Sequence, residues 1–323
     1  MSNSTEQQIN VTTPDMFQVY LVKGLYGAFC VSPSIVFLYI NGIMLFTLRS
    51  KSVFRETPRY LLLYNLLFTD TFQLAMGQLL LILSLPPVFL TQYTCTIIVL
   101  ISVTVTSVSP LNLAVMSLER YVAVCFPLRH SAIVTVNNTG VSIGVIWALS
   151  SIDPLIRFIL LVLYETFSAD QIMQQFCAID ALFHSTVAHE YDKAFTAITF
   201  TFVGIIIMCS YFGVMIVARS ASSDKASTTK ARNTVLLHMI QLLLCLSTSL
   251  FGILTGYIYR LGTLNRTARL IVGYIFFIFI INLPRCLSSL IYGLRDQTIR
   301  LVFLHHLRCA LWTGWPSVTT DKH

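Results

Sequence analysis

Charged side chains stand within or at the ends of long apolar runs, and the chemistry open to them is ion pairing. They are Asp70, Glu119, Arg120, Asp153, Arg157 and Arg285. An ionisable residue at membrane depth is costly unless it is paired or functional. No serine, aspartate or metal-ligand pair occurs at catalytic spacing, so we expect neither an enzyme nor a bound metal or cofactor.

The composition identifies the solvent around these charges. Of 323 residues, 55% are hydrophobic and 11% charged, against a charged share of roughly 25% in soluble domains. Continuous apolar runs, each long enough to span a hydrocarbon core of about 30 Å as a helix, cover 23–48, 60–85, 95–126, 141–164, 195–218, 234–259 and 270–292. A barrel would alternate instead. We therefore expect an all-α bundle of seven transmembrane helices.

The distribution of Lys and Arg predicts the orientation. The first and fifth connections and the segment after the last run are basic. By contrast, the fourth connection carries five acidic residues against Lys193, and the sixth carries Arg260, Arg266 and Arg269. Basic residues collect in cytoplasmic loops, so we expect an extracellular tail at 1–22, a membrane domain at 23–292, and a cytoplasmic amphipathic helix and tail at 293–323. The expected cellular location is the plasma membrane. Sequons at Asn3, Asn10 and Asn265 lie on the outer side, where glycosylation would be possible.

The net charge of +7 does not require a nucleic-acid partner, because the cytoplasmic segments account for most of it. Among the eight cysteines, this topology leaves Cys95 and Cys177 clearly exposed to the oxidising outer face. We expect them to form a disulfide, which would pull the outer loop over the bundle; the alternative is two free thiols. On the opposite side, Cys309 follows a short amphipathic stretch and is either palmitoylated or free.

The third run ends in a recognisable motif. Residues 116–130 read MSLERYVAVCFPLRH, which closely resembles the helix-three signature of rhodopsin-like G-protein-coupled receptors in its odorant-receptor form. Residues 58–70, PRYLLLYNLLFTD, keep that family's spacing from a proline to a buried aspartate, and Tyr211 stands at its helix-five tyrosine position. The resemblance spans nearly the whole chain and is nearest to fish-type odorant receptors.

The resemblance implies a mechanism. Glu119 would hold Arg120 at rest, and Arg120 would swing to a heterotrimeric G protein of the stimulatory olfactory type when helix six moves outward. Tyr121 belongs to the same motif. Tyr211 and Tyr292 would steady the open form, or they are ordinary interfacial anchors. The implied ligand is a small organic odorant.

The seventh run departs from the family. The Asn-Pro-x-x-Tyr motif reads SSLIY at 288–292, and Pro284 could supply the kink instead. Arg285 lies beside it, inside the span. Our hypothesis is that Arg285 pairs with Asp70, which in many such receptors lines a sodium site; the alternative is that Arg285 faces lipid and snorkels. The internal polar network would comprise Asn41, Asp70, Ser109, Arg285 and Ser288.

Two further features concern ligand binding. Asp153 and Arg157, four residues apart, can pair along one helix face, in a structural or a binding role. Amine receptors of this class place an aspartate where Ser102 stands, so we do not expect a monoamine ligand. The candidate pocket is mainly apolar with a few hydroxyls and comprises Val99, Ser102, Val103, Thr106, Ser107, Phe195, Thr196, Thr199, Phe251, Leu254, Tyr257, Tyr274 and Ile278.

Other functions stay open. A transporter or channel would use the intramembrane charges as a polar path, although the sequence shows no inverted repeat. A receptor fold that does not signal is a second alternative, because the missing Asn-Pro could weaken coupling. The outer loop carries a net negative charge, which either attracts cationic odorants or is a solvated face.

Overall fold

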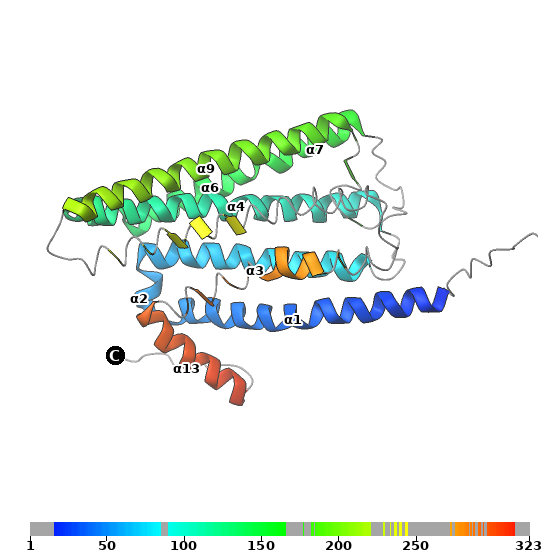
Figure 1. Ribbon diagram of the computed structural model, residues 1–323, viewed down its shortest axis with the longest axis horizontal. Helices are drawn as coiled ribbons and strands as arrows, with labels where there is room; N and C mark the ends of the chain where they lie inside the picture. Colours follow the sequence, from blue (N-terminus) through cyan, green and yellow to red (C-terminus); the bar gives the residue numbers. More distant parts are fainter. Residues whose placement is uncertain are drawn as a thin grey trace, which may run out of the picture.

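The computed structural model describes residues 16–84, 90–165, 185–220 and 296–313, together with Cys177, Leu182, Phe183 and scattered helical positions between 229 and 293. Every regular element in these parts is helical. The long helices α1 (Met16–Ser50), α3 (Pro58–Ser84), α4 (Gln92–Cys125) and α9 (Thr186–Ser220) run side by side as a bundle (Figure 1). Helix α4 lies at its centre, packed against both α3 and α9.

Shorter helices connect or extend the long ones. They are α2 (Ser52–Arg55), α5 (Pro127–Ile133), α6 (Val136–Ser150), α7 (Ile152–Tyr164), the π-helix η1 (Phe277–Asn282) and α13 (Gln297–Thr313). Helix α13, red in Figure 1, leaves the bundle at an angle beside α2 and the end of α1.

Five candidate membrane spans are found among the described residues: Val31–Ser50, Pro58–Leu83, Gln92–Cys125, Val136–Tyr164 and Thr186–Val217. They correspond to the first five runs expected from the sequence. The sixth and seventh runs lie largely outside the described residues. Their described positions are helical.

The structure corrects the bounds of the fourth and fifth runs. The fourth was expected to be one helix, but it begins earlier, at Val136, and divides at Ser151 into α6 and α7. Pro154 explains the break, because its ring would clash with the carbonyl of Ser150 four residues before it and it has no N–H to donate.

The fifth helix begins at Thr186, nine residues before the start of the run at Phe195. Ser185 caps it, with Oγ accepting a hydrogen bond from the Ala188 N–H at 3.3 Å. Glu190 and Asp192 therefore lie on α9 and not in a loop. Hydropathy did not detect this start of the helix, because the first turns of α9 contain charged residues.

Apolar packing divides the interior into two clusters. The larger joins α1, α3, α4, α9 and α13 through residues such as Ile43, Leu66, Leu113, Ile207 and Phe303. The smaller lies at the other end of α4, around the cysteine pair. Large apolar side chains such as Leu163 and Ile198 point outward, as expected where lipid is the solvent.

Candidate functional site

A buried ion pair joins α3 to the seventh run. Arg285 Nη1 lies 2.8 Å from Asp70 Oδ1, and the two side chains are 3% and 1% exposed. Ser109 on α4 donates its hydroxyl to the same carboxylate oxygen at 3.0 Å. The structure thus places Arg285 against Asp70, as hypothesised from the sequence, and not toward lipid. Asn41 is also fully buried, on α1, whereas Ser288 lies outside the described residues.

An irregular helix precedes Arg285. The π-helix η1 ends at Asn282, three residues before the arginine. Asn282 donates to Ser34 Oγ on α1 at 2.8 Å and accepts from Gln78 Nε2 on α3 at 3.4 Å. A π-turn inserts an extra residue into a helix and changes the direction of the side chains that follow. Pro284, the expected kink, lies outside the described residues.

Amide side chains hold three helices together deeper in the bundle. Asn65 on α3 donates to Asn112 Oδ1 on α4 at 3.1 Å and accepts from the Trp147 ring N–H on α6 at 3.0 Å. Asn112 in turn donates to the Leu62 carbonyl at 2.9 Å. The sequence analysis missed this series of hydrogen bonds. Helical periodicity shows which face of a helix a residue occupies, but it does not show which neighbouring helix that face contacts.

The Glu119–Arg120 pair stands at the end of α4. Arg120 Nε lies 3.2 Å from Glu119 Oε2, and His130 Nε2 on α5 lies 3.7 Å from the other carboxylate oxygen. Tyr121 packs over Gly213 on α9, where a Cβ would overlap its ring. Only glycine therefore fits under Tyr121 in this arrangement. Gly213 gave no signal in the sequence.

Of the two tyrosines expected to act in switching, the structure describes only Tyr211. Tyr211 on α9 is half-buried and packs beside the larger apolar cluster. Tyr292, its expected counterpart, lies outside the described residues. Their role in steadying the open form is therefore still a prediction.

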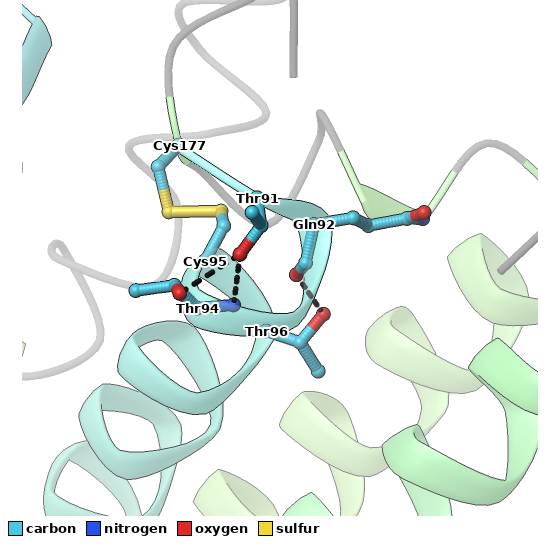
Figure 2. The surroundings of a disulfide bond; sticks show 6 residues. All are labelled: Thr91, Gln92, Thr94, Cys95, Thr96 and Cys177. Carbon is cyan, nitrogen blue, oxygen red and sulfur yellow. Dashed lines mark hydrogen bonds between the residues drawn. A yellow bond between two sulfur atoms is a disulfide. The ribbon is translucent and has the colours of Figure 1, made fainter. Parts of the chain in front are cut away.

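A disulfide closes the opposite end of α4. Cys95 and Cys177 are bonded, with their Cα atoms 5.6 Å apart and 82 residues apart in the sequence (Figure 2). Thr91 caps α4, and its Oγ1 accepts from the Thr94 N–H at 3.3 Å. Leu161 and Leu182 pack beneath the disulfide. The bond fixes Cys177 at this end of α4.

The candidate pocket residues of α4 occupy different environments. Val99 and Val103 are buried in the apolar cluster beneath the disulfide. Thr106 donates to the Ser102 carbonyl and accepts from Gln73 Nε2 on α3, both at 2.8 Å. Ser102 and Ser107 are half-buried. Gln73 was not expected from the sequence, and it adds a polar group from α3 beside this stripe.

Across the bundle, Phe195, Thr196 and Thr199 are half-buried on α9, which packs against α4. Ile278 lies in η1, where only its backbone is described. Several residues predicted from the sequence fall outside the described part of the chain: Phe251, Leu254, Tyr257 and Tyr274 of the pocket, and the sequons at Asn3, Asn10 and Asn265.

A second buried charge cluster joins α7 to α9. Arg157 Nε lies 3.0 Å from Asp153 Oδ1, as the spacing of four predicts, and Arg157 Nη2 lies 2.6 Å from Asp192 Oδ1. Tyr191 donates its hydroxyl to Asp153 Oδ1 at 3.0 Å and stacks on Phe195 with ring centres 5.8 Å apart. Asp192 and Tyr191 were missed because that segment was assigned to a loop.

The chemistry that these buried charged and amide side chains show is ion pairing and hydrogen bonding between helices. Within the described residues, no group of three or more His, Cys, Asp or Glu side chains is arranged to hold a metal ion.

Comparisons with known proteins agree on the family. Residues 40–303 match the family of "7 transmembrane receptor (rhodopsin family)". The chain is 34% identical over 282 residues to Odorant receptor 131-2 of Danio rerio, covering 86% of this chain and 84% of that protein. It is 25% identical over 253 residues to human Olfactory receptor 7A17, covering 76% and 79%.

A second human protein, Olfactory receptor 2AJ1, is 23% identical over 242 residues, covering 67% of this chain and 71% of its own length. The residues that carried the sequence resemblance and the observed helical bundle are in accord with these matches. The chain therefore belongs to the rhodopsin family of seven-transmembrane receptors, as a fish-type odorant receptor.

Proposed function

We propose that this receptor binds a small organic odorant between the outer halves of its helices and activates a stimulatory olfactory-type G protein. The observation that carries the proposal is the closed Glu119–Arg120 pair at the end of α4 opposite the disulfide. A guanidinium held by a neighbouring carboxylate can exchange that partner for another one. The arrangement supports a resting state that opens on ligand binding.

The proposed orientation places the disulfide end outside and α13 in the cytoplasm. It rests on the basic first and fifth connections and the acidic outer segment. It makes the chain a seven-helix, multi-pass protein of the plasma membrane, with a tail at 1–22, a membrane domain at 23–292 and a cytoplasmic segment at 293–323. It would leave the sequons at Asn3, Asn10 and Asn265 open to glycosylation.

The ligand would contact residues from α4 and α9. Half-buried hydroxyls at Ser102, Ser107, Thr196 and Thr199 lie on helices that pack together, with Phe195 among them. A mainly apolar site with a few hydroxyls suits a neutral or weakly polar molecule. Asp192 is held by Arg157, so attraction of cationic odorants by this carboxylate is weaker than the acidic sequence suggested.

The Arg285 guanidinium would serve as a permanent counter-ion for the buried Asp70 carboxylate. In a receptor where a bound cation neutralises the buried aspartate, that cation can leave. Here the cation is part of the chain, and it links α3 to the seventh run through one carboxylate that α4 also contacts. We expect this link to compensate in part for the missing Asn-Pro.

A reporter assay for cyclic AMP tests the proposal. Cells expressing the wild type and Arg120→Ala would be exposed to one panel of water-soluble odorants, with surface expression measured in parallel. We expect odorant-dependent cyclic AMP in the wild type and its loss in Arg120→Ala. Arg55→Ala is the matched control, because Arg55 lies exposed on α2 and outside the 116–130 motif, and it should respond like the wild type.

The other outcomes separate the alternatives. A response that persists in Arg120→Ala would contradict the proposed coupling. Odorant uptake or ionic current without any second messenger would indicate a transporter or channel. Normal surface expression with neither response nor transport across the panel would indicate a receptor fold that does not signal.

A further inference from the structure

Helix α13 is attached to the bundle at two points. At its start, the Asp296 carboxylate accepts hydrogen bonds from the backbone N–H groups of Thr298 and Ile299 at 3.1 and 3.4 Å and lies 3.3 Å from Arg59 Nη1. Two to three turns further on, His306 is buried against α1. The first attachment is an ordinary helix cap with an ion pair. The second is unusual because it buries a titratable ring.

His306 occupies a closely packed site. Its Nδ1 lies 3.0 Å from Thr47 Oγ1, and its ring meets Phe46 edge-on with centres 5.2 Å apart. Ile299 and Phe303 lie on the same face of α13 and are buried in the larger apolar cluster. Thr47 is fully buried. Among the side chains of α13 that the structure describes, His306 is thus a polar group on an otherwise apolar docking face.

The hydrogen bonds determine which ring nitrogen carries the proton. Thr47 donates its only hydroxyl proton to the Ile43 carbonyl at 2.8 Å. Its oxygen can then only accept from His306, so the neutral ring has its proton on Nδ1. A second proton would bind at Nε2. Protonation would keep the bond to Thr47 but would bury a charge.

The surroundings oppose that charge. Burial lowers the pKa of His306, and the neighbouring His305 and Lys51 lower it further. In the described part of the chain, the charged groups that act on His306 are these two, one on α13 and one between α1 and α2. Both are cationic when charged, so neither would compensate a protonated His306.

We propose that His306 is a pH-sensitive latch, which holds α13 against α1 while the imidazole is neutral and releases the helix when the imidazole is protonated. A histidine with a lowered pKa in the docked state leaves docking unaffected above its ordinary value of about 6.5. Docking weakens as the pH falls below that value toward the lower pKa of the docked state. In the proposed orientation, the sensed pH is that of the cytosol.

The latch can be tested on the purified full-length receptor without ligand or G protein. Hydrogen exchange of the α13 backbone amides would be measured by mass spectrometry at about pH 7.5 and about pH 5.5, on either side of the ordinary histidine pKa. Peptides from α4, corrected for intrinsic exchange rates, serve as the internal reference. We expect α13 alone to lose protection at the lower pH, by up to about tenfold in the docking equilibrium, because pH 5.5 lies about one unit below the ordinary histidine pKa.

Three variants make the result specific. His306→Phe keeps a ring against Phe46 but cannot titrate, and its α13 should stay protected at both pH values. His306→Lys carries a permanent charge, and its α13 should exchange rapidly at both. His305→Phe is the matched control at the adjacent, exposed position. It removes one neighbouring charge but leaves the burial that is the largest cause of the lowered pKa of His306, so it should keep a pH response of reduced size.

Several outcomes would overturn the latch. They are a pH-dependent loss of protection in His306→Phe, wild-type protection in His306→Lys, or a lost response in His305→Phe. If His306→Phe fails to fold, His306→Gln replaces it with the same expectation. Since the experiment contains neither odorant nor G protein, a failure of the proposed signalling function would leave its result unchanged.

Discussion

The two buried charge clusters differ in how many acids surround the arginine. Among the described residues of the central cluster, Arg285 forms an ion pair with one carboxylate, that of Asp70, and both side chains are almost completely buried. In the α7–α9 cluster, Arg157 contacts two carboxylates, one buried and one that is 41% exposed. The first cluster has no excess charge, whereas the second carries one excess negative charge.

This difference indicates different tolerance to change. A buried carboxylate that loses its only counter-ion cannot be hydrated, so the full desolvation cost appears. A partly exposed carboxylate such as that of Asp192 can rotate into solvent and be hydrated. Asp153 also keeps the Tyr191 hydroxyl as a donor if Arg157 is lost. We therefore expect the central cluster to be essential for folding and the α7–α9 cluster to adjust the position of α9.

The largest effect is expected for Arg285→Met. This change leaves Asp70 buried without the guanidinium, although the Ser109 hydroxyl still donates to it, and breaking a buried pair typically costs about 3–5 kcal/mol. We expect surface expression to fall close to background, as measured by antibody staining of a tagged N-terminus on intact cells.

Reversing both charges provides the control. Asp70→Arg and Arg285→Asp should each abolish surface expression, and the double variant should recover a substantial part of it. If the double variant is no better than either single one, the pair does not stabilise the protein in the way proposed.

Much of the central cluster could be anticipated from the sequence. Hydropathy located the first five spans, and the rule that a buried arginine needs an acid pointed from Arg285 to Asp70. The rotation of each helix could not be derived, so the contacts of Gln73 with Thr106 and of Asn65 with Trp147 appeared only in the structure. Rotation depends on packing over the whole helix face and not on a local pattern.

The α7–α9 cluster was only half predictable. The spacing of Asp153 and Arg157 is local, and the structure has that pair. Asp192 and Tyr191 lie in the charged first turns of α9, and hydropathy placed the start of the helix at Phe195, too late to include them. The Ser185 cap was the available signal for this helix start.

Arg157→Met should have an intermediate effect. It leaves Asp153 buried but still bonded to Tyr191, and it frees Asp192 to face water, so we expect a loss of about 2–3 kcal/mol, below the usual range for a buried pair. Thermal unfolding of the purified receptor would measure it. Lys193→Met, which removes an exposed ion pair with Glu190 on the same helix, should change stability far less. Equal losses in Arg157→Met and Arg285→Met would contradict the contrast between the clusters.

Asp192→Asn should have a small effect. The amide oxygen can still accept a hydrogen bond from Arg157, and the lost Coulombic attraction is screened at an exposed carboxylate, so we expect less than about 1 kcal/mol. The same change at the buried acid, Asp153→Asn, should cost more in the same thermal assay. A larger loss for Asp192→Asn would mean that the rim carboxylate, and not the buried one, is the main partner of Arg157.

The smallest effect is expected from sodium. In the wild type, the Arg285 guanidinium occupies the position beside Asp70 Oδ1 that a bound cation would need, so replacing sodium chloride with choline chloride should leave the unfolding temperature unchanged. Arg285→Gln removes that charge but keeps a donor, and leaves Asp70 able to bind a cation. A ligand that binds only the folded state raises its stability with concentration, so this variant should gain sodium-dependent stability. Arg157→Gln should not gain sodium-dependent stability, because the exposed Asp192 carboxylate of that cluster is already hydrated and does not need a bound cation. Sodium-dependent stabilisation of the wild type as large as that of Arg285→Gln would show that Arg285 does not take the place of the ion.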